Sequence, residues 1–136
     1  MPTDQFPSLE DAEIVEIDFL TLAGGNRRLK LLVDSGFTGQ SSIILGDEHN
    51  DLIRAVMEPA PASGALHGEQ NRAWVMCRIP EIGLQKTLIG ILTDLSPLSL
   101  PEGIRGMVGL SVLRLFTRWG AEKSGDRWKF FLSFDT

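Results

Sequence analysis

Residues 29–39 read Leu-Lys-Leu-Leu-Val-Asp-Ser-Gly-Phe-Thr-Gly, an apolar strand that runs directly into a carboxylate and a glycine-rich turn. This order places Asp34 at the point where a buried strand ends. Because burial makes a carboxylate costly to ionise, an acid in this position points to a chemical role. The chain contains no second Asp-Ser-Gly or Asp-Thr-Gly. If Asp34 works as one of a pair, the other carboxylate must come from a second copy of the chain.

The composition predicts one compact domain with no linker or repeat. A length of 136 residues with 43% hydrophobic residues is sufficient for a single core. The net charge is −5 and the longest basic stretch is Arg27-Arg28-Leu29-Lys30, which disfavours nucleic acid and anionic membranes as partners. A peptide or protein partner remains open.

Cysteine use and the N-terminal sequence predict the compartment. Cys77 is the single cysteine and lies in the strand-like stretch Trp74-Val75-Met76-Cys77, so no internal disulfide can form and a reducing compartment is expected. The first residues lack a basic region followed by an apolar run, and no later stretch has the length of a membrane span. We therefore expect a soluble, cytoplasmic protein.

The spacing of apolar residues predicts mostly strands. Residues 13–19 alternate with period two, a turn follows at residues 23–26, and residues 28–33 return as the strand that ends at Asp34. Further strands are expected over residues 41–45, 86–92 and 128–134, and short helices over 47–57 and 110–116. The sequence of residues 62–79 predicts a long hairpin with its tip near His67, Gly68 and Glu69.

Two stretches of this sequence resemble the signature of retropepsin-like aspartic proteases, and in particular of their small bacterial members. Residues 33–39, Val-Asp-Ser-Gly-Phe-Thr-Gly, are similar to the active-site turn of that family, and Met107-Val108-Gly109 before a short helix is similar to its second motif. The order of the other expected elements also agrees. The resemblance implies an all-β, closed-barrel acid protease fold with one or two short helices and one lobe per chain. Residues 1–12 would form an N-terminal extension, and residues 13–136 the protease domain.

The resemblance also implies an activity and the residues that perform it. Peptide hydrolysis needs a base to activate water and an acid to protonate the carbonyl oxygen and the leaving amine, and two carboxylates that share one proton provide both. Asp34 from each chain of a two-fold homodimer would form that pair. Ser35, Gly36, Thr38 and Gly109 are expected to support the active site, and His67, Gly68 and Glu69 to contact a peptide substrate as part of a flap.

Other catalytic chemistries find no support in the sequence. His49 and His67 have no partners at metal-ligand spacing, so we expect solvent-facing histidines, no metal and no cofactor. Ser35 has no nucleophile-elbow pattern around it. Trp74, Trp119 and Trp128 are expected in the core or in a subunit interface.

Three hypotheses follow from the sequence. The first is a homodimeric aspartic endopeptidase that acts through Asp34. The second is a catalytically silent module that keeps the fold and the peptide groove, since a fold can persist after its chemistry is lost. The third is a monomeric β-domain in which Asp-Ser-Gly is an ordinary turn.

Overall fold

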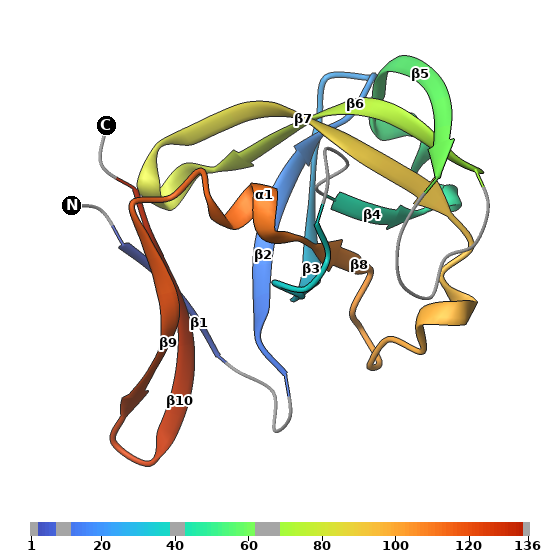
Figure 1. Ribbon diagram of the computed structural model, residues 1–136. Helices are drawn as coiled ribbons and strands as arrows, with labels where there is room; N and C mark the ends of the chain where they lie inside the picture. The colour runs from blue at the N-terminus through green and yellow to red at the C-terminus, as the bar shows by residue number, and fades with distance from the viewer. Residues whose placement is uncertain (1–2, 8–11, 39–42, 62–68, 135–136) are drawn as a thin grey trace.

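The chain folds into a β-barrel with a separate small sheet beside it (Figure 1). The structure is a computed structural model, and it describes residues 3–7, 12–38, 43–61 and 69–134. In these residues there are ten strands, one short α-helix and three 3₁₀ segments. The strands are β1 (Thr3–Pro7), β2 (Ile14–Leu20), β3 (Asn26–Val33), β4 (Ile43–Gly46), β5 (Ile53–Pro61), β6 (Glu69–Ile79), β7 (Leu84–Thr93), β8 (Gly106–Val108), β9 (Arg118–Ser124) and β10 (Arg127–Ser133). The helical segments are η1 (Asp47–Leu52), η2 (Pro80–Ile82), η3 (Ser96–Leu98) and α1 (Leu110–Leu113).

The large sheet closes on itself. Its strand order is β2-β3-β8-β4-β7-β6-β5, and an additional pairing of β2 with β6 joins the two sides into a ring of six strands, with β5 outside on β6. Most neighbours are antiparallel, but β3 pairs with β8 and β4 with β7 in parallel. The predicted all-β, closed-barrel fold with few short helices is confirmed.

The inward side chains of the ring form the main core. β2 and β3 show the expected alternation, with Ile17, Phe19, Leu29 and Leu31 buried between more exposed neighbours. The turn between them uses Gly24, whose φ of 93° is rarely accessible to other residues. The hairpin predicted over residues 13–33 is confirmed, with strand ends that differ by one or two residues.

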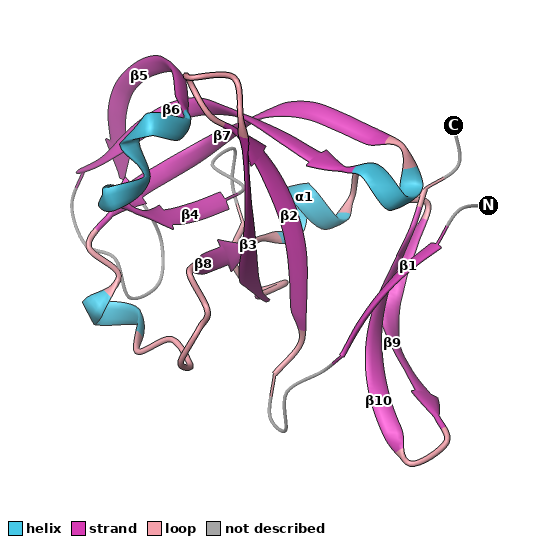
Figure 2. Cartoon of the chain, turned by 180° about the vertical axis from the view of Figure 1, so that it is seen from behind, coloured by secondary structure: helices cyan, strands magenta, loops and turns pink. Residues whose placement is uncertain are grey.

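The second sheet has the order β1-β10-β9 and stands beside the barrel (Figure 2). Residues inside the expected N-terminal extension thus form β1, which pairs antiparallel with β10 of the same chain. Phe6 of β1 and Phe130 and Leu132 of β10 are buried in the main core, so this sheet is packed onto the barrel through its inner face.

One prediction about the middle of the sequence is wrong, and another is narrowed. Residues 47–57 do not form one helix, because a 3₁₀ segment ends at Leu52 and Ile53 begins β5, which pairs with β6. Pro59 and Pro61 lie in β5, an edge strand, where a residue without an N–H is tolerated. Trp74, Trp119 and Trp128 are 37%, 38% and 53% exposed in a single chain, so they do not fill the core, and the alternative position in a subunit interface stays a prediction.

The other short elements agree better with their predictions. The 110–116 helix is present but ends at Leu113, and β7 and β10 cover the strands predicted over residues 86–92 and 128–134 almost completely. Among the described residues, no helix has the length and apolar character needed to cross a membrane.

Candidate active site

Asp34 lies where β3 ends beside β8. Leu32 and Val33 pair in parallel with Met107 and Val108, and the backbone N–H of Asp34 continues this ladder by donating to the Val108 carbonyl at 2.9 Å. On the other side, the Val33 N–H donates to the Glu13 carbonyl at 2.9 Å. The position of the carboxylate is therefore set by two neighbouring segments and not by its turn alone.

The turn itself is closed by the Asp34 side chain. Its Oδ1 accepts the N–H of Gly36 at 2.9 Å, and the Asp34 carbonyl accepts the N–H of Phe37 at 3.1 Å. This is the local hydrogen bonding expected of Asp in a tight turn. A Cβ on Gly36 would lie 3.2 Å from Oδ1, so glycine leaves room for the carboxylate. Asp34 is half-buried, and Ser35, Gly36 and Thr38 are exposed, so in a single chain the carboxylate is accessible to water and to a ligand.

Gly109 holds the turn against the start of α1. The Phe37 carbonyl accepts the N–H of Leu110 at 2.9 Å. A Cβ on Gly109 would lie 2.5 Å from that carbonyl oxygen and 2.6 Å from Cδ2 of the Phe37 ring. The φ of Gly109 is −103°, which any residue can adopt, so the requirement for glycine here is one of space. Both segments singled out in the sequence are thus brought into direct contact.

A second, smaller apolar cluster lies under the turn. Phe37 is buried together with residues of β4, β7 and β8, namely Ile44, Ile91 and Met107. Half-buried leucines pack against them from β3 and from the segment that follows β7; these are Leu32, Leu95, Leu98 and Leu100. The turn is therefore anchored by Phe37 on one side and flanked by partly exposed apolar surface on the other.

The predicted flap residues are only partly described. β5 and β6 form an antiparallel hairpin in which Pro61 pairs with Glu69, so the hairpin begins before the predicted range, at Ile53. Glu69 is the first residue of β6, and His67 and Gly68 lie outside the described residues. Contact of these three residues with a substrate stays a prediction.

The burial of His49 differs from the prediction. The sequence predicts a solvent-facing side chain, yet His49 is 8% exposed, with Nδ1 3.4 Å from Nη1 of Arg27 and Nε2 3.5 Å from Oε1 of Glu48. Burial, together with the nearby Arg27, lowers the pKa of His49 in spite of the opposing effect of Glu48. Within the described residues, no group of three or more His, Cys, Asp or Glu side chains could hold a metal ion.

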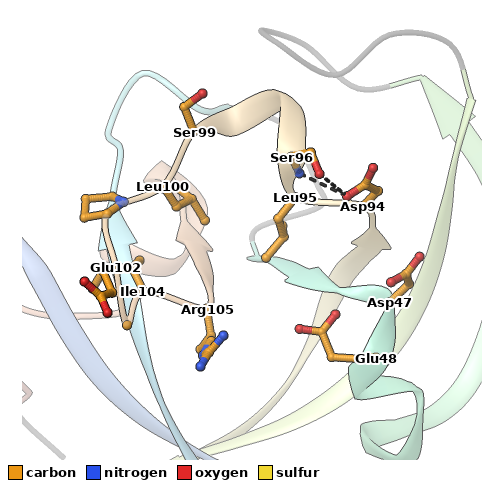
Figure 3. A pocket seen from close by; sticks show the side chains of 12 residues that line it. Asp47, Glu48, Asp94, Leu95, Ser96, Ser99, Leu100, Glu102, Ile104 and Arg105 are labelled. Carbon is orange, nitrogen blue, oxygen red and sulfur yellow. Dashed lines mark hydrogen bonds between the residues drawn. The ribbon is translucent and has the colours of Figure 1, made fainter.

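A polar cavity of about 530 Å³ lies between η1 and the segment between β7 and β8, and no described residue of the Asp34 turn lines it (Figure 3). Carboxylates of Asp47, Glu48, Asp94 and Glu102 line it together with the side chain of Arg105. The Asp94 Oδ1 accepts the backbone N–H of Ser96 at 3.1 Å and the Ser96 hydroxyl at 2.7 Å, which lowers the pKa of Asp94. No local sequence pattern indicates this cavity, because its walls come from segments far apart in the chain.

Comparison with known proteins supports the fold. No family model matches this sequence, and no curated protein does. Among solved structures, the chain is similar to a retropepsin-like aspartic protease from Rickettsia conorii, with 20% identity, a TM-score of 0.51, and coverage of 96% of this chain and 91% of that one. The resemblance noted in the sequence is thus confirmed at the level of the fold, which is retropepsin-like.

Proposed function

We propose that this protein is an aspartic endopeptidase that hydrolyses peptide bonds with water activated between two Asp34 carboxylates, one from each subunit of a homodimer. The observation on which this proposal rests is the position of Asp34. Its carboxylate is half-buried and sits in a turn held by Val108 and Gly109, in a retropepsin-like fold. The solved relative is an aspartic protease, which supports a peptidase activity for the same fold.

The need for a second copy follows from the chemistry. One carboxylate must act as a base toward water while another group acts as an acid toward the carbonyl oxygen. Two carboxylates a few ångströms apart cannot both be ionised, so they share one proton and supply both functions. Since the chain has one Asp-Ser-Gly turn, the pair requires a two-fold axis close to Asp34 and an isologous interface.

The neighbouring residues have distinct supporting roles in this proposal. The exposed hydroxyl of Ser35 is available for hydrogen bonds across the two-fold axis, and that of Thr38 supports the turn. Gly36 keeps the space beside Oδ1 open for the attacking water, and Gly109 fixes the turn on β8 and α1. His67, Gly68 and Glu69 would cover a bound peptide. The half-buried leucines beside the turn offer apolar surface to its side chains.

The substrate is a peptide or protein, and neither a cofactor nor a metal takes part. We further propose that the protein acts in the cytoplasm, because Cys77 is a free buried thiol in a chain that cannot form an internal disulfide.

The test compares wild type with Asp34→Asn on a mixed peptide library between about pH 4 and 7, the range in which carboxylate pairs of this kind work. Asp126→Asn, in the turn between β9 and β10, is the matched control for loss of one carboxylate elsewhere. We expect cleavage by the wild type and the control and none by Asp34→Asn, with light scattering showing a dimer for all three.

Three outcomes would contradict the proposal. Equal cleavage by wild type and Asp34→Asn would mean that another group, or a contaminant, hydrolyses the peptides. Binding of a peptide with no cleavage by any variant would favour the silent peptide-binding module. A strict monomer that cleaves nothing would favour the ordinary turn.

A further inference from the structure

An arginine on the outside of the barrel is surrounded by carboxylates. Arg28 of β3 contacts Glu16 Oε2 at 3.3 Å and Asp18 Oδ1 at 3.3 Å, both on β2, and Glu81 Oε1 at 3.0 Å, on η2. These three ion pairs join β2, β3 and η2 where the small sheet meets the barrel. The single positive charge of Arg28 therefore faces three carboxylates, so these four side chains together carry a net negative charge.

Asp4 of β1 adds a fourth carboxylate to this group. Its Oδ1 accepts the backbone N–H of Gln5 at 3.0 Å, but its Oδ2 is buried and has no hydrogen-bond partner among the described residues. Side chains alternate along a strand, so Asp4 is on the same face of β1 as Phe6, whose ring is 2% exposed in the main core. Because Phe6 is buried in the core, Asp4 on the same face of β1 also lies against the barrel.

The charged groups that act on Asp4 come from three of the elements around β1. Glu81 on η2 and Glu16 on β2 repel its ionised form, while Arg28 on β3 attracts it. β10 places Leu132 opposite Asp4, and Lys129 belongs to the other face of that strand. The pKa of Asp4 is raised above its usual value of 3.8; burial is the largest cause, and repulsion by Glu81 is the second.

We propose that Asp4 is a proton-operated latch: binding of a proton at its buried carboxylate strengthens the docking of β1 on the barrel, and release of that proton weakens it. A protonated Asp4 is not repelled by Glu16 and Glu81, and its O–H becomes a hydrogen-bond donor. An ionised Asp4 leaves an uncompensated charge in a partly buried position. This inference does not depend on the proposed peptidase activity.

The direction of the pH effect follows from linkage. A carboxyl group whose pKa is higher in the docked state contributes stability that is fully present below about pH 3.8 and is lost as the pH rises through the raised value. The equilibrium for opening β1 should change about tenfold for each pH unit between the free and the docked pKa of Asp4. Above the raised value, it should reach a plateau.

Hydrogen exchange of the β1 amides tests this proposal. The ratio of exchange rates in wild type and Asp4→Asn cancels the intrinsic pH dependence of exchange, and the β3 amides of the same samples report any global opening. We expect wild-type β1 to become progressively less protected than the variant as the pH rises from about 4 through the raised pKa of Asp4, and to stay less protected above it. Glu81→Gln should reduce that pH dependence, and the control Asp126→Asn should leave it unchanged.

Several results would overturn the latch. If the ratio of β1 exchange rates is the same at every pH, or if Asp4→Asn gives β1 no added protection at neutral pH, then ionisation of Asp4 does not control docking. If the pH dependence survives in Asp4→Asn, another group is responsible. If β1 and β3 open together with equal rates, the effect is on global stability and not on the docking of this strand.

Discussion

Replacement of Gly109 by alanine should destabilise the fold through the Asp34 turn. The added Cβ would lie 2.5 Å from the carbonyl oxygen of Phe37 and 2.6 Å from its ring, distances that a real Cβ does not reach. The ring is buried in the apolar cluster and the oxygen is part of the backbone, so neither can move without displacing the turn. The hydrogen bond from the Leu110 N–H to that oxygen should be lost or lengthened.

The size of the effect follows from these contacts. Forcing a methyl group into a well-packed site costs about 1–3 kcal/mol, and losing one backbone hydrogen bond adds about 1 kcal/mol. The smaller conformational entropy of alanine in the unfolded chain offsets about 0.4–1 kcal/mol. We therefore expect Gly109→Ala to lower the free energy of unfolding by about 1–3.6 kcal/mol, with no contribution from backbone strain at a φ of −103°.

Denaturant unfolding followed by tryptophan fluorescence measures this change. Gly120→Ala is the matched control, because a Cβ there would make only ordinary contacts of 3.6 Å with the Phe131 ring. We expect the control to stay within about 0.5 kcal/mol of wild type, as surface substitutions do. If Gly109→Ala is as stable as the control, then glycine is not required for the approach of Phe37 and the assignment of Gly109 as a support of the turn is incorrect.

Two further predictions concern buried groups outside the turn. Burial lowers the pKa of His49 below its usual 6.5, so the stability that neutral His49 contributes is present above about pH 6.5 and is lost as the pH falls. Thermal unfolding should therefore show that His49→Gln loses less stability between about pH 7.5 and 5 than wild type does. An equal loss in both proteins would assign the effect elsewhere. Burial also raises the pKa of the Cys77 thiol, which is 2% exposed, so a thiol reagent should label it only after unfolding. Rapid labelling of the native protein would contradict the buried position.

The sequence predicted those parts of the fold that depend on local pattern and on resemblance. The alternation in residues 13–33 identified the first hairpin, and the Asp34 turn and Met107-Val108-Gly109 together indicated the fold. The position of Gly109 beside the turn came from resemblance alone. Its physical reason, the close approach of the Phe37 carbonyl, depends on a contact between distant segments that no local pattern encodes.

The incorrect predictions have the same cause. Leu52, Ile53 and Val56 have a spacing that suits one face of a helix, but pairing with β6 makes a strand of the residues after Leu52. His49 is buried beside Arg27, which comes twenty-two positions earlier in the chain, and no local pattern indicates that contact. The group around Arg28 draws on β1, β2, β3 and η2, so its sequence positions show no motif.

The parallel pairing of β3 with β8 also determines when in synthesis the site can exist. More than half of the chain separates Leu32 from its partner Met107. The hydrogen bond from the Asp34 N–H can form only once the Val108 carbonyl is in place. Contacts between such distant positions form late, since a long loop must close first. A nascent chain on the ribosome would thus hold Asp34 in an unfinished turn until β8 and α1 have emerged. Any activity that depends on this turn would therefore begin only after the C-terminal third of the chain has been made.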